Sequence, residues 1–210
     1  MKKFRKARGV PLLKDPIAIF SSEWLAERLG MNVVVMIRHP AAFVSSIVAR
    51  NKKENWRFDF KNMVEQPLLI EHLLKEFEPD ILEFLNSDGD IVDESILLWS
   101  IIHAVIAQYR DNHPEWTFLR HEDVSRRPEE IFQNLYEQLG LEWTAEIRQF
   151  VQESTRGSNA TTENTHAFNT VRDSSANLSA WKRILTQAEI DRIEAGTRRV
   201  AAQFYSDEDW

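Results

Sequence analysis

Arg38 and Ser46 are the residues whose types and spacing best suit the binding of an anion. Arg38 follows a continuous apolar run at 33–37, which is typical of a parallel strand covered on both faces. Pro40 suits the first turn of a helix that continues through Ser45 and Ser46. A guanidinium, hydroxyl groups and free backbone N–H groups at a helix start all favour a phosphate. The alternative is an arginine paired with a nearby carboxylate beside small, packed serines.

Alternating strands and helices are expected to position these residues. The pattern predicts strand, helix, strand, helix in the first part of the chain, which indicates a parallel sheet, and a further strand and helix near the middle, closed by Gly140. Polar residues with few aliphatic neighbours predict a long loop later in the chain. The expected elements are strands at 10–13, 33–37 and 116–120, helices at 21–29, from 40 and at 128–139, a helical insertion at 62–110 over the ligand face of the sheet, and a loop at 156–178.

Composition indicates one soluble domain of mixed α/β class. The chain has 210 residues, of which 43% are hydrophobic and 28% charged, enough for a single substantial core over 1–210. A net charge of −7 disfavours nucleic acid as a main partner, and the absence of cysteine excludes disulfides and cysteine-based zinc sites. No apolar run is long enough to suggest a membrane span, and no secretion signal is evident at the start, so a cytoplasmic location is expected.

Three stretches of the chain resemble the sulfotransferase family, which uses 3′-phosphoadenosine 5′-phosphosulfate, and in particular its bacterial and carbohydrate branch. They are LLKDP with VVVMIRHPAAFVSSI, WTFLRHEDVSRRPEEIFQNLYEQLGL, and NTVRDSSANLSAWKRILTQAEIDRIEAGTRRVAAQFY. The resemblance implies a three-layer fold like that of the P-loop NTPases, with a parallel sheet flanked by helices. It also implies transfer of a sulfuryl group to a hydroxyl or amine acceptor, with adenosine 3′,5′-bisphosphate as the product and no metal.

The resemblance assigns roles to residues that match its motifs. Arg38 and Ser46, eight residues apart, match the pair that binds the 3′-phosphate, and Arg172 and Ser174 match a loop that covers the cofactor. Lys14, twenty-four residues before Arg38, matches a lysine that stabilises the leaving group. The alternatives are an ordinary surface lysine and a solvated loop arginine.

The catalytic base is the least determined part of the match. Pro16 stands where cytosolic members of the family carry a catalytic histidine, and the KDP sequence is instead similar to the carbohydrate branch. Asp15 is therefore a candidate for taking the proton of the acceptor if burial raises its pKa. An aspartate before proline is also common turn chemistry.

One family motif has no counterpart in the sequence. Members carry upstream a loop of the type P-x-S-G-T-T, in which glycines let backbone N–H groups close around the phosphosulfate. None of the six glycines here lies in that context, and STRGSNATT at 154–162 follows a helix rather than a strand. The chain is therefore expected to begin after that loop, which leaves its activity in isolation open.

Two other candidate sites are interpreted as structural. Glu122 and Asp123 follow a strand, but adjacent residues point in different directions, so we expect an anchor rather than an acid–base pair. His103, on an apolar face beside Trp99, is expected to be a satisfied core histidine.

The alternatives to a sulfotransferase are a noncatalytic bisphosphate-binding or helical interaction protein and a nucleotide kinase-like phosphotransferase. The sequence does not define the acceptor or the oligomeric state.

Overall fold

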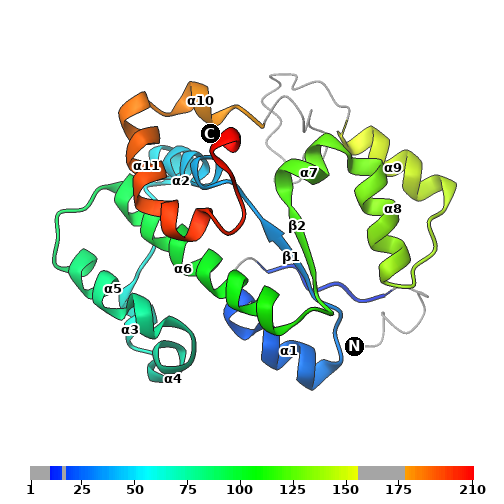
Figure 1. The fold of residues 1–210 in the computed structure, drawn as a ribbon, viewed down its shortest axis with the longest axis horizontal. Coiled ribbons are helices and arrows are strands. Elements are labelled where there is room, and N and C mark those ends of the chain that lie inside the picture. Colours follow the sequence, from blue (N-terminus) through cyan, green and yellow to red (C-terminus); the bar gives the residue numbers. More distant parts are fainter. Residues whose placement is uncertain (1–9, 16–17, 156–177) are drawn as a thin grey trace.

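The computed structural model describes residues 10–15, 18–155 and 178–210 (Figure 1). It is a mixed α/β structure, mostly helical, with a small parallel sheet. The elements in chain order are η2 (Ala18–Ser21), α1 (Ser22–Leu29), β1 (Val34–Ile37), α2 (Pro40–Glu54), α3 (Lys61–Val64), α4 (Pro67–Leu69), η3 (Ile70–Leu74), η4 (Lys75–Phe77), α5 (Glu78–Leu85), α6 (Ile91–Asn112), β2 (Thr117–Arg120), α7 (His121–Arg126), α8 (Pro128–Gln138), α9 (Ala145–Thr155), α10 (Trp181–Ile184), α11 (Gln187–Ala201) and η5 (Asp207–Asp209).

Most of the expected elements form, but the strand expected at 10–13 does not. Residues 10–15 have no regular secondary structure, and the side chains of Val10, Leu12 and Leu13 are 71%, 89% and 51% exposed. A strand needs a neighbour for its backbone hydrogen bonds, and among the described residues β1 pairs only with β2. The apolar character of residues 10–13 was therefore insufficient to predict a strand.

The sheet consists of β1 and β2, which run parallel with Ile37 opposite Arg120. Along β1 burial alternates, so that Val35 and Ile37 lie in the core while Val34 and Met36 are 39% and 47% exposed. The prediction that this strand is covered on both faces is therefore wrong for the described residues, because the side chains of Val34 and Met36 remain partly open to solvent. Of the expected α/β fold, the described residues form a two-stranded parallel sheet within a mostly helical structure.

Helix α6 is the centre of the core. It packs against α2, α11, β1 and η2 (Figure 1), and Trp99, Ile101 and Val105 are completely buried. By length and composition alone it could cross a membrane, yet 61% of its most apolar window is buried inside the protein. The 62–110 segment is helical as expected, although its longest helix, α6, forms part of the core. The first turn is fixed by a capping box, in which the Asp90 side chain accepts from the Val92 and Asp93 N–H groups.

The close crossing of α6 and α11 allows a test of the packing. A Cβ atom added at Gly196 would lie 2.7 Å from Cγ2 of Ile96. Alanine favours a helix over glycine by about 1 kcal/mol, but overpacking costs about 1–3 kcal/mol. We therefore expect Gly196→Ala to lower the free energy of unfolding by about 1 kcal/mol in a urea titration. In an Ile96→Ala background the same change should stabilise the protein, and a stabilising Gly196→Ala in the wild type would contradict the packing.

Candidate functional site

Parallel pairing brings the ends of β1 and β2 to one edge of the sheet. Since Ile37 lies opposite Arg120, the residues that follow each strand, Arg38 and His39 in one chain segment and Glu122 in the other, become neighbours. In Figure 1 this edge lies beside the starts of α2 and α7. The prediction that Arg38 stands at the carboxyl end of a strand and directly before a helix is confirmed.

The backbone of Arg38 is held by two side chains of α6. Its N–H donates to Nε2 of His103 at 3.4 Å, and its carbonyl oxygen accepts the indole N–H of Trp99 at 2.9 Å. Because Nε2 accepts a hydrogen bond, the neutral His103 ring carries its proton on Nδ1, which lies 2.9 Å from the Trp99 carbonyl oxygen. The two rings stack with centroids 4.0 Å apart. His103 is thus the satisfied core histidine that was expected.

The Arg38 side chain keeps its hydrogen-bonding capacity largely unused. Nη1 lies 3.5 Å from Oγ of Ser46, a long contact, and the buried Nε has no hydrogen-bond partner in the described structure. No described carboxylate forms an ion pair with Arg38, so the alternative of a simple paired arginine is wrong for this part of the chain. Burial lowers the pKa of the guanidinium, which the nearby charge of Glu122 partly offsets.

Ser46 is oriented by its own helix. Its hydroxyl donates to the Phe43 carbonyl oxygen at 2.7 Å, one turn earlier in α2. The Ser46 oxygen therefore faces the Arg38 guanidinium with its lone pairs. The structure brings together these two residues, whose spacing of eight indicated a shared anion site.

The start of α2 differs from the expected open helix terminus. His39 caps it, because its Nδ1 accepts the Ala41 N–H at 3.2 Å, and Pro40 has no N–H to offer. Pro40 and Ala41 are buried, and the His39 ring stacks on Trp181 with centroids 5.2 Å apart. The prediction that free N–H groups at the helix start bind the anion is therefore not supported at Ala41. The Arg38 guanidinium and the Ser46 hydroxyl remain the candidate groups for binding an anion.

Glu122 joins the two strand ends to the C-terminal part of the chain. Its carboxylate accepts the His39 N–H at 3.0 Å through Oε1 and the Tyr205 hydroxyl at 3.0 Å through Oε2, and the residue is only 6% exposed. Burial together with the Glu122 charge strongly raises the pKa of the Tyr205 hydroxyl, so this group stays protonated as a donor. The expectation that Glu122 is an anchor rather than half of an acid–base pair is supported.

Arg120 lies at the same edge of the sheet, and its guanidinium interacts with other residues of the protein. Its Nη2 donates to Asp209 at 2.6 Å, its Nε lies 3.8 Å from Asp123, and its guanidinium lies 4.4 Å from the centre of the Tyr205 ring. These contacts occupy Arg120 within the protein. Of these two arginines, Arg38 is therefore the one without an ion pair among the described residues, although Nε of each lacks a hydrogen-bond partner there.

Because two histidines of this site are buried, we predict that the free energy of unfolding falls at acid pH. Burial lowers the pKa of His103 to about 3 and that of His39 to about 4, from an ordinary value near 6.5. Below pH 6.5 the unfolded chain binds protons that the folded chain rejects, so stability falls as pH falls and continues to fall until the folded pKa values are reached. We expect urea titrations at pH 7 and pH 5 to differ by about 3 kcal/mol in the free energy of unfolding.

His113 provides the control for this pH dependence. The Glu23 carboxylate, 2.9 Å away, raises the pKa of His113, so protonation of His113 stabilises the folded state as the pH falls. His113→Gln should therefore steepen the loss between pH 7 and pH 5. Equal stabilities of the wild type at the two pH values would contradict the assignment of His39 and His103 as neutral.

Lys14 and Asp15 are not joined to Arg38 by any hydrogen bond or ion pair in the described residues. Both are exposed, in the irregular segment before η2, so the burial on which the role of Asp15 was predicted to depend is not observed. Their catalytic roles stay predictions. Arg172 and Ser174 lie outside the described residues, as does nearly all of the 156–178 segment.

Sequence reasoning missed the aromatic cluster around His39. Besides Trp181, the ring meets Tyr205 and Trp210 with centroids 5.0 and 4.6 Å away, and these partners are distant in sequence. The only available signal was the concentration of large aromatic residues in an otherwise polar C-terminal region. That signal predicts burial but not the partner.

Comparisons with known proteins give a distant similarity to carbohydrate sulfotransferases. The chain is 25% identical to carbohydrate sulfotransferase 1 of Danio rerio over 166 residues, which cover 78% of this chain and 35% of that protein. It is 27% identical to carbohydrate sulfotransferase 3 of Mus musculus over 179 residues, 82% of this chain and 30% of that protein. The chain thus spans about a third of the length of these relatives. No family profile matches it, and no solved structure does.

Proposed function

We propose that this chain contributes the 3′-phosphate half of a sulfotransferase site that uses 3′-phosphoadenosine 5′-phosphosulfate. The observation that carries the proposal is the Arg38 guanidinium, which is half-buried, 3.5 Å from Ser46 and without an ion-pair partner among the described residues. A cation partly removed from water and left unpaired is costly unless an anion joins it. A phosphate supplies charge and acceptors in the geometry that a guanidinium fork prefers. The names of the two relatives favour this reading over a kinase.

The proposed reaction is transfer of a sulfuryl group to a hydroxyl or amine, with a carbohydrate hydroxyl favoured by the names of the relatives. The donor supplies an activated sulfuryl group. The sulfur–oxygen bond to the 5′-phosphate breaks as a bond to the acceptor forms, and adenosine 3′,5′-bisphosphate leaves. In this chain Arg38 and Ser46 hold the 3′-phosphate, with Arg172 and Ser174 as further contacts, and Lys14 offsets the charge of the leaving group. Asp15 is proposed to receive the acceptor proton.

Thermal unfolding with adenosine 3′,5′-bisphosphate tests the half-site. At about a hundredfold excess over the dissociation constant, binding should add about 2.7 kcal/mol and raise the midpoint by roughly 5–10 °C. A cooperative transition that does not move would contradict the proposal. A broad, uncooperative transition without a shift would show that this chain requires further sequence to form the site, and would also count against a half-site in the chain alone.

Turnover separates an enzyme from a noncatalytic bisphosphate-binding protein. Both share the Arg38 site, but only the enzyme consumes the sulfuryl donor in the presence of an acceptor. The chain is incubated with the sulfuryl donor and a mixture of neutral sugars as acceptors. Chromatography then measures the adenosine 3′,5′-bisphosphate that is released. Binding without release would favour the noncatalytic protein.

A further inference from the structure

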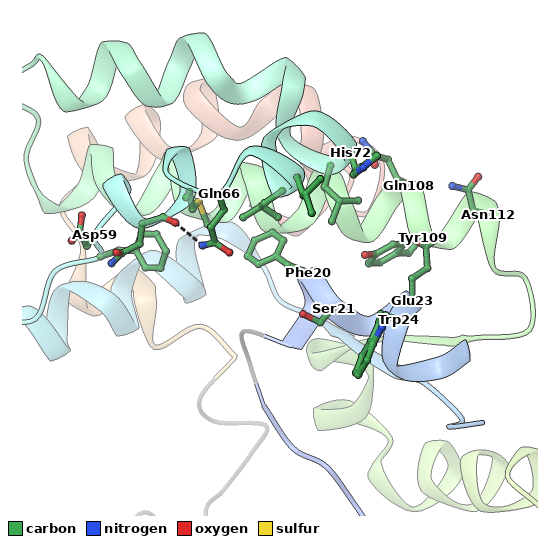
Figure 2. Close-up of a pocket in the computed structure, with 16 residues that line it drawn as sticks. Phe20, Ser21, Glu23, Trp24, Asp59, Gln66, His72, Gln108, Tyr109 and Asn112 are labelled. Carbon is green, nitrogen blue, oxygen red and sulfur yellow. Dashed lines mark hydrogen bonds between the residues drawn. The ribbon is translucent and has the colours of Figure 1, made fainter. Parts of the chain in front are cut away.

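Helix α1 forms part of the wall of a cavity, yet none of its own residues is buried. The cavity has a volume of about 990 Å³ and is lined by η2 and α1, by α3, α4 and η3, and by the C-terminal half of α6. Figure 2 shows Glu23 and Trp24 of α1 at one end of it, together with Tyr109 of α6. A change in the position of α1 would therefore change this end of the cavity.

Few contacts hold α1 against the rest of the protein. Ala26 is partly buried against the core, and the Ser22 hydroxyl donates to the Ala18 carbonyl oxygen of the adjoining η2 at 2.9 Å. Beyond η2, the one side-chain hydrogen bond that α1 makes to another described element joins Glu23 to His113, with Oε1 2.9 Å from Nε2. A helix of eight residues is not stable by itself, so α1 depends on these contacts.

Both ring nitrogens of His113 face carboxylates. Nε2 lies 2.9 Å from Glu23, and Nδ1 lies 3.1 Å from Glu115. An ionised carboxylate only accepts hydrogen bonds, and a neutral imidazole has a single N–H, so both contacts are hydrogen bonds only when the ring is protonated. The ring also stacks on Trp116 with centroids 4.2 Å apart, which fixes its orientation. This geometry selects the imidazolium form of His113.

The groups around His113 support the protonated ring. Glu23 comes from α1, Glu115 from the turn before β2, and Tyr109 from α6, where its ring centroid lies 5.9 Å from that of the imidazole. Burial and the Glu23 charge raise the pKa of Tyr109 to about 12, so its hydroxyl stays neutral. The hydrogen bond to Glu23 raises the pKa of His113 above its ordinary value near 6.5.

We propose that His113 is a pH-sensitive latch, which holds α1 against the end of α6 when the ring is protonated and loosens it when the ring loses its proton. The neutral ring keeps one N–H, so it donates to Glu23 or to Glu115 but not to both, and the charge that attracts them is gone. Because the folded pKa of His113 is raised, the latch is complete below about pH 6.5 and weakens as the pH rises through the raised pKa. This inference goes beyond the proposed nucleotide site and does not depend on it.

Amide hydrogen exchange of α1, followed by NMR at pH 6 and pH 9, tests the latch. The reporters are the amides of α1 and the Gly30 N–H, which donates to the Ala26 carbonyl oxygen at 2.9 Å. After correction for the intrinsic exchange rate, the opening constant of α1 should be about two- to fivefold larger at pH 9, the effect of one partly exposed ion pair. Burial lowers the pKa of His39, His103 and His121, so these histidines do not titrate in this range.

Two variants and a matched control assign the effect. His113→Gln and Glu23→Gln should each remove most of the pH dependence, and Glu23→Gln leaves the stacked His113 ring in place, so a merely structural role of the ring would leave that dependence unchanged. His72→Gln is the control, because His72 is exposed and lines the same cavity but makes no hydrogen bond to α1 among the described residues. It should behave as the wild type does. An opening constant that is equal at the two pH values in the wild type, or a pH dependence that persists in Glu23→Gln, would overturn the inference.

Discussion

Glu122→Ala is expected to lower the free energy of unfolding by about 2–5 kcal/mol, the largest loss from any single side chain at the strand edge. The change leaves the His39 N–H and the Tyr205 hydroxyl without their acceptor. Each is a polar group that loses its partner in a buried setting, and each such group costs about 1–3 kcal/mol. The change also removes the hydrogen-bonded link between the turn after β1 and Tyr205, which leaves the ring contacts of His39 with Tyr205 and Trp210 between them.

Urea unfolding at pH 7 measures this loss. Glu122→Gln should lose less, because an amide oxygen still accepts the His39 N–H and the amide group can still pair with the Tyr205 hydroxyl. Glu130→Ala is the control: this carboxylate is exposed and pairs with Arg127 at 2.9 Å, so its removal should change stability by less than about 1 kcal/mol. Similar stabilities for Glu122→Ala and Glu130→Ala would contradict the anchoring role.

Arg38→Ala is expected to weaken binding of adenosine 3′,5′-bisphosphate by roughly 100-fold and to abolish the thermal shift that this ligand causes. A charge-assisted hydrogen bond is worth about 1.5–3 kcal/mol, and a guanidinium can form two with one phosphate. The free protein should change little, because Arg38 has no ion pair to lose among the described residues and its burial disfavours the charged form. Loss of ligand response without loss of stability is the signature of a binding residue.

Two variants control this experiment. Arg38→Met keeps an apolar stem without the charge, so it should match Arg38→Ala in binding while preserving the packing. Arg50→Ala removes a cation from α2, the helix that follows Arg38, where Arg50 pairs with Glu54 at 3.1 Å; this variant should bind the bisphosphate as the wild type does. Equal weakening in Arg50→Ala and Arg38→Ala would indicate a general charge effect rather than a site.

Local patterns were enough to predict the elements that carry the site. The apolar run before Arg38, the proline at the start of α2 and the helical spacing closed by Gly140 each act over a few residues, and the structure contains β1, α2 and α8 accordingly. Gly140 adopts φ of +64°, the left-handed conformation in which a glycine ends a helix at little cost. The spacing of Arg38 and Ser46 predicted their proximity because both belong to one strand–turn–helix unit.

Features that depend on distant partners could not be predicted. Residues 10–13 resemble a strand in composition, but a strand requires a neighbour that the described structure does not provide. The helix start looked open because nothing local indicates that His39 turns back as its cap, beneath Trp181. Glu122 and Tyr205 are 83 residues apart in the sequence, and no local pattern around either residue indicates the other as its partner.

Titration calorimetry with two nucleotides tests the central claim most directly, because the claim concerns one phosphate group. Adenosine 3′,5′-bisphosphate and adenosine 5′-monophosphate differ only in the 3′-phosphate that Arg38 and Ser46 are proposed to hold. We predict that the wild-type chain binds the bisphosphate at least roughly tenfold more tightly and that Arg38→Ala removes this preference. Equal affinities for the two nucleotides in the wild-type chain, or no binding of either, would contradict the account.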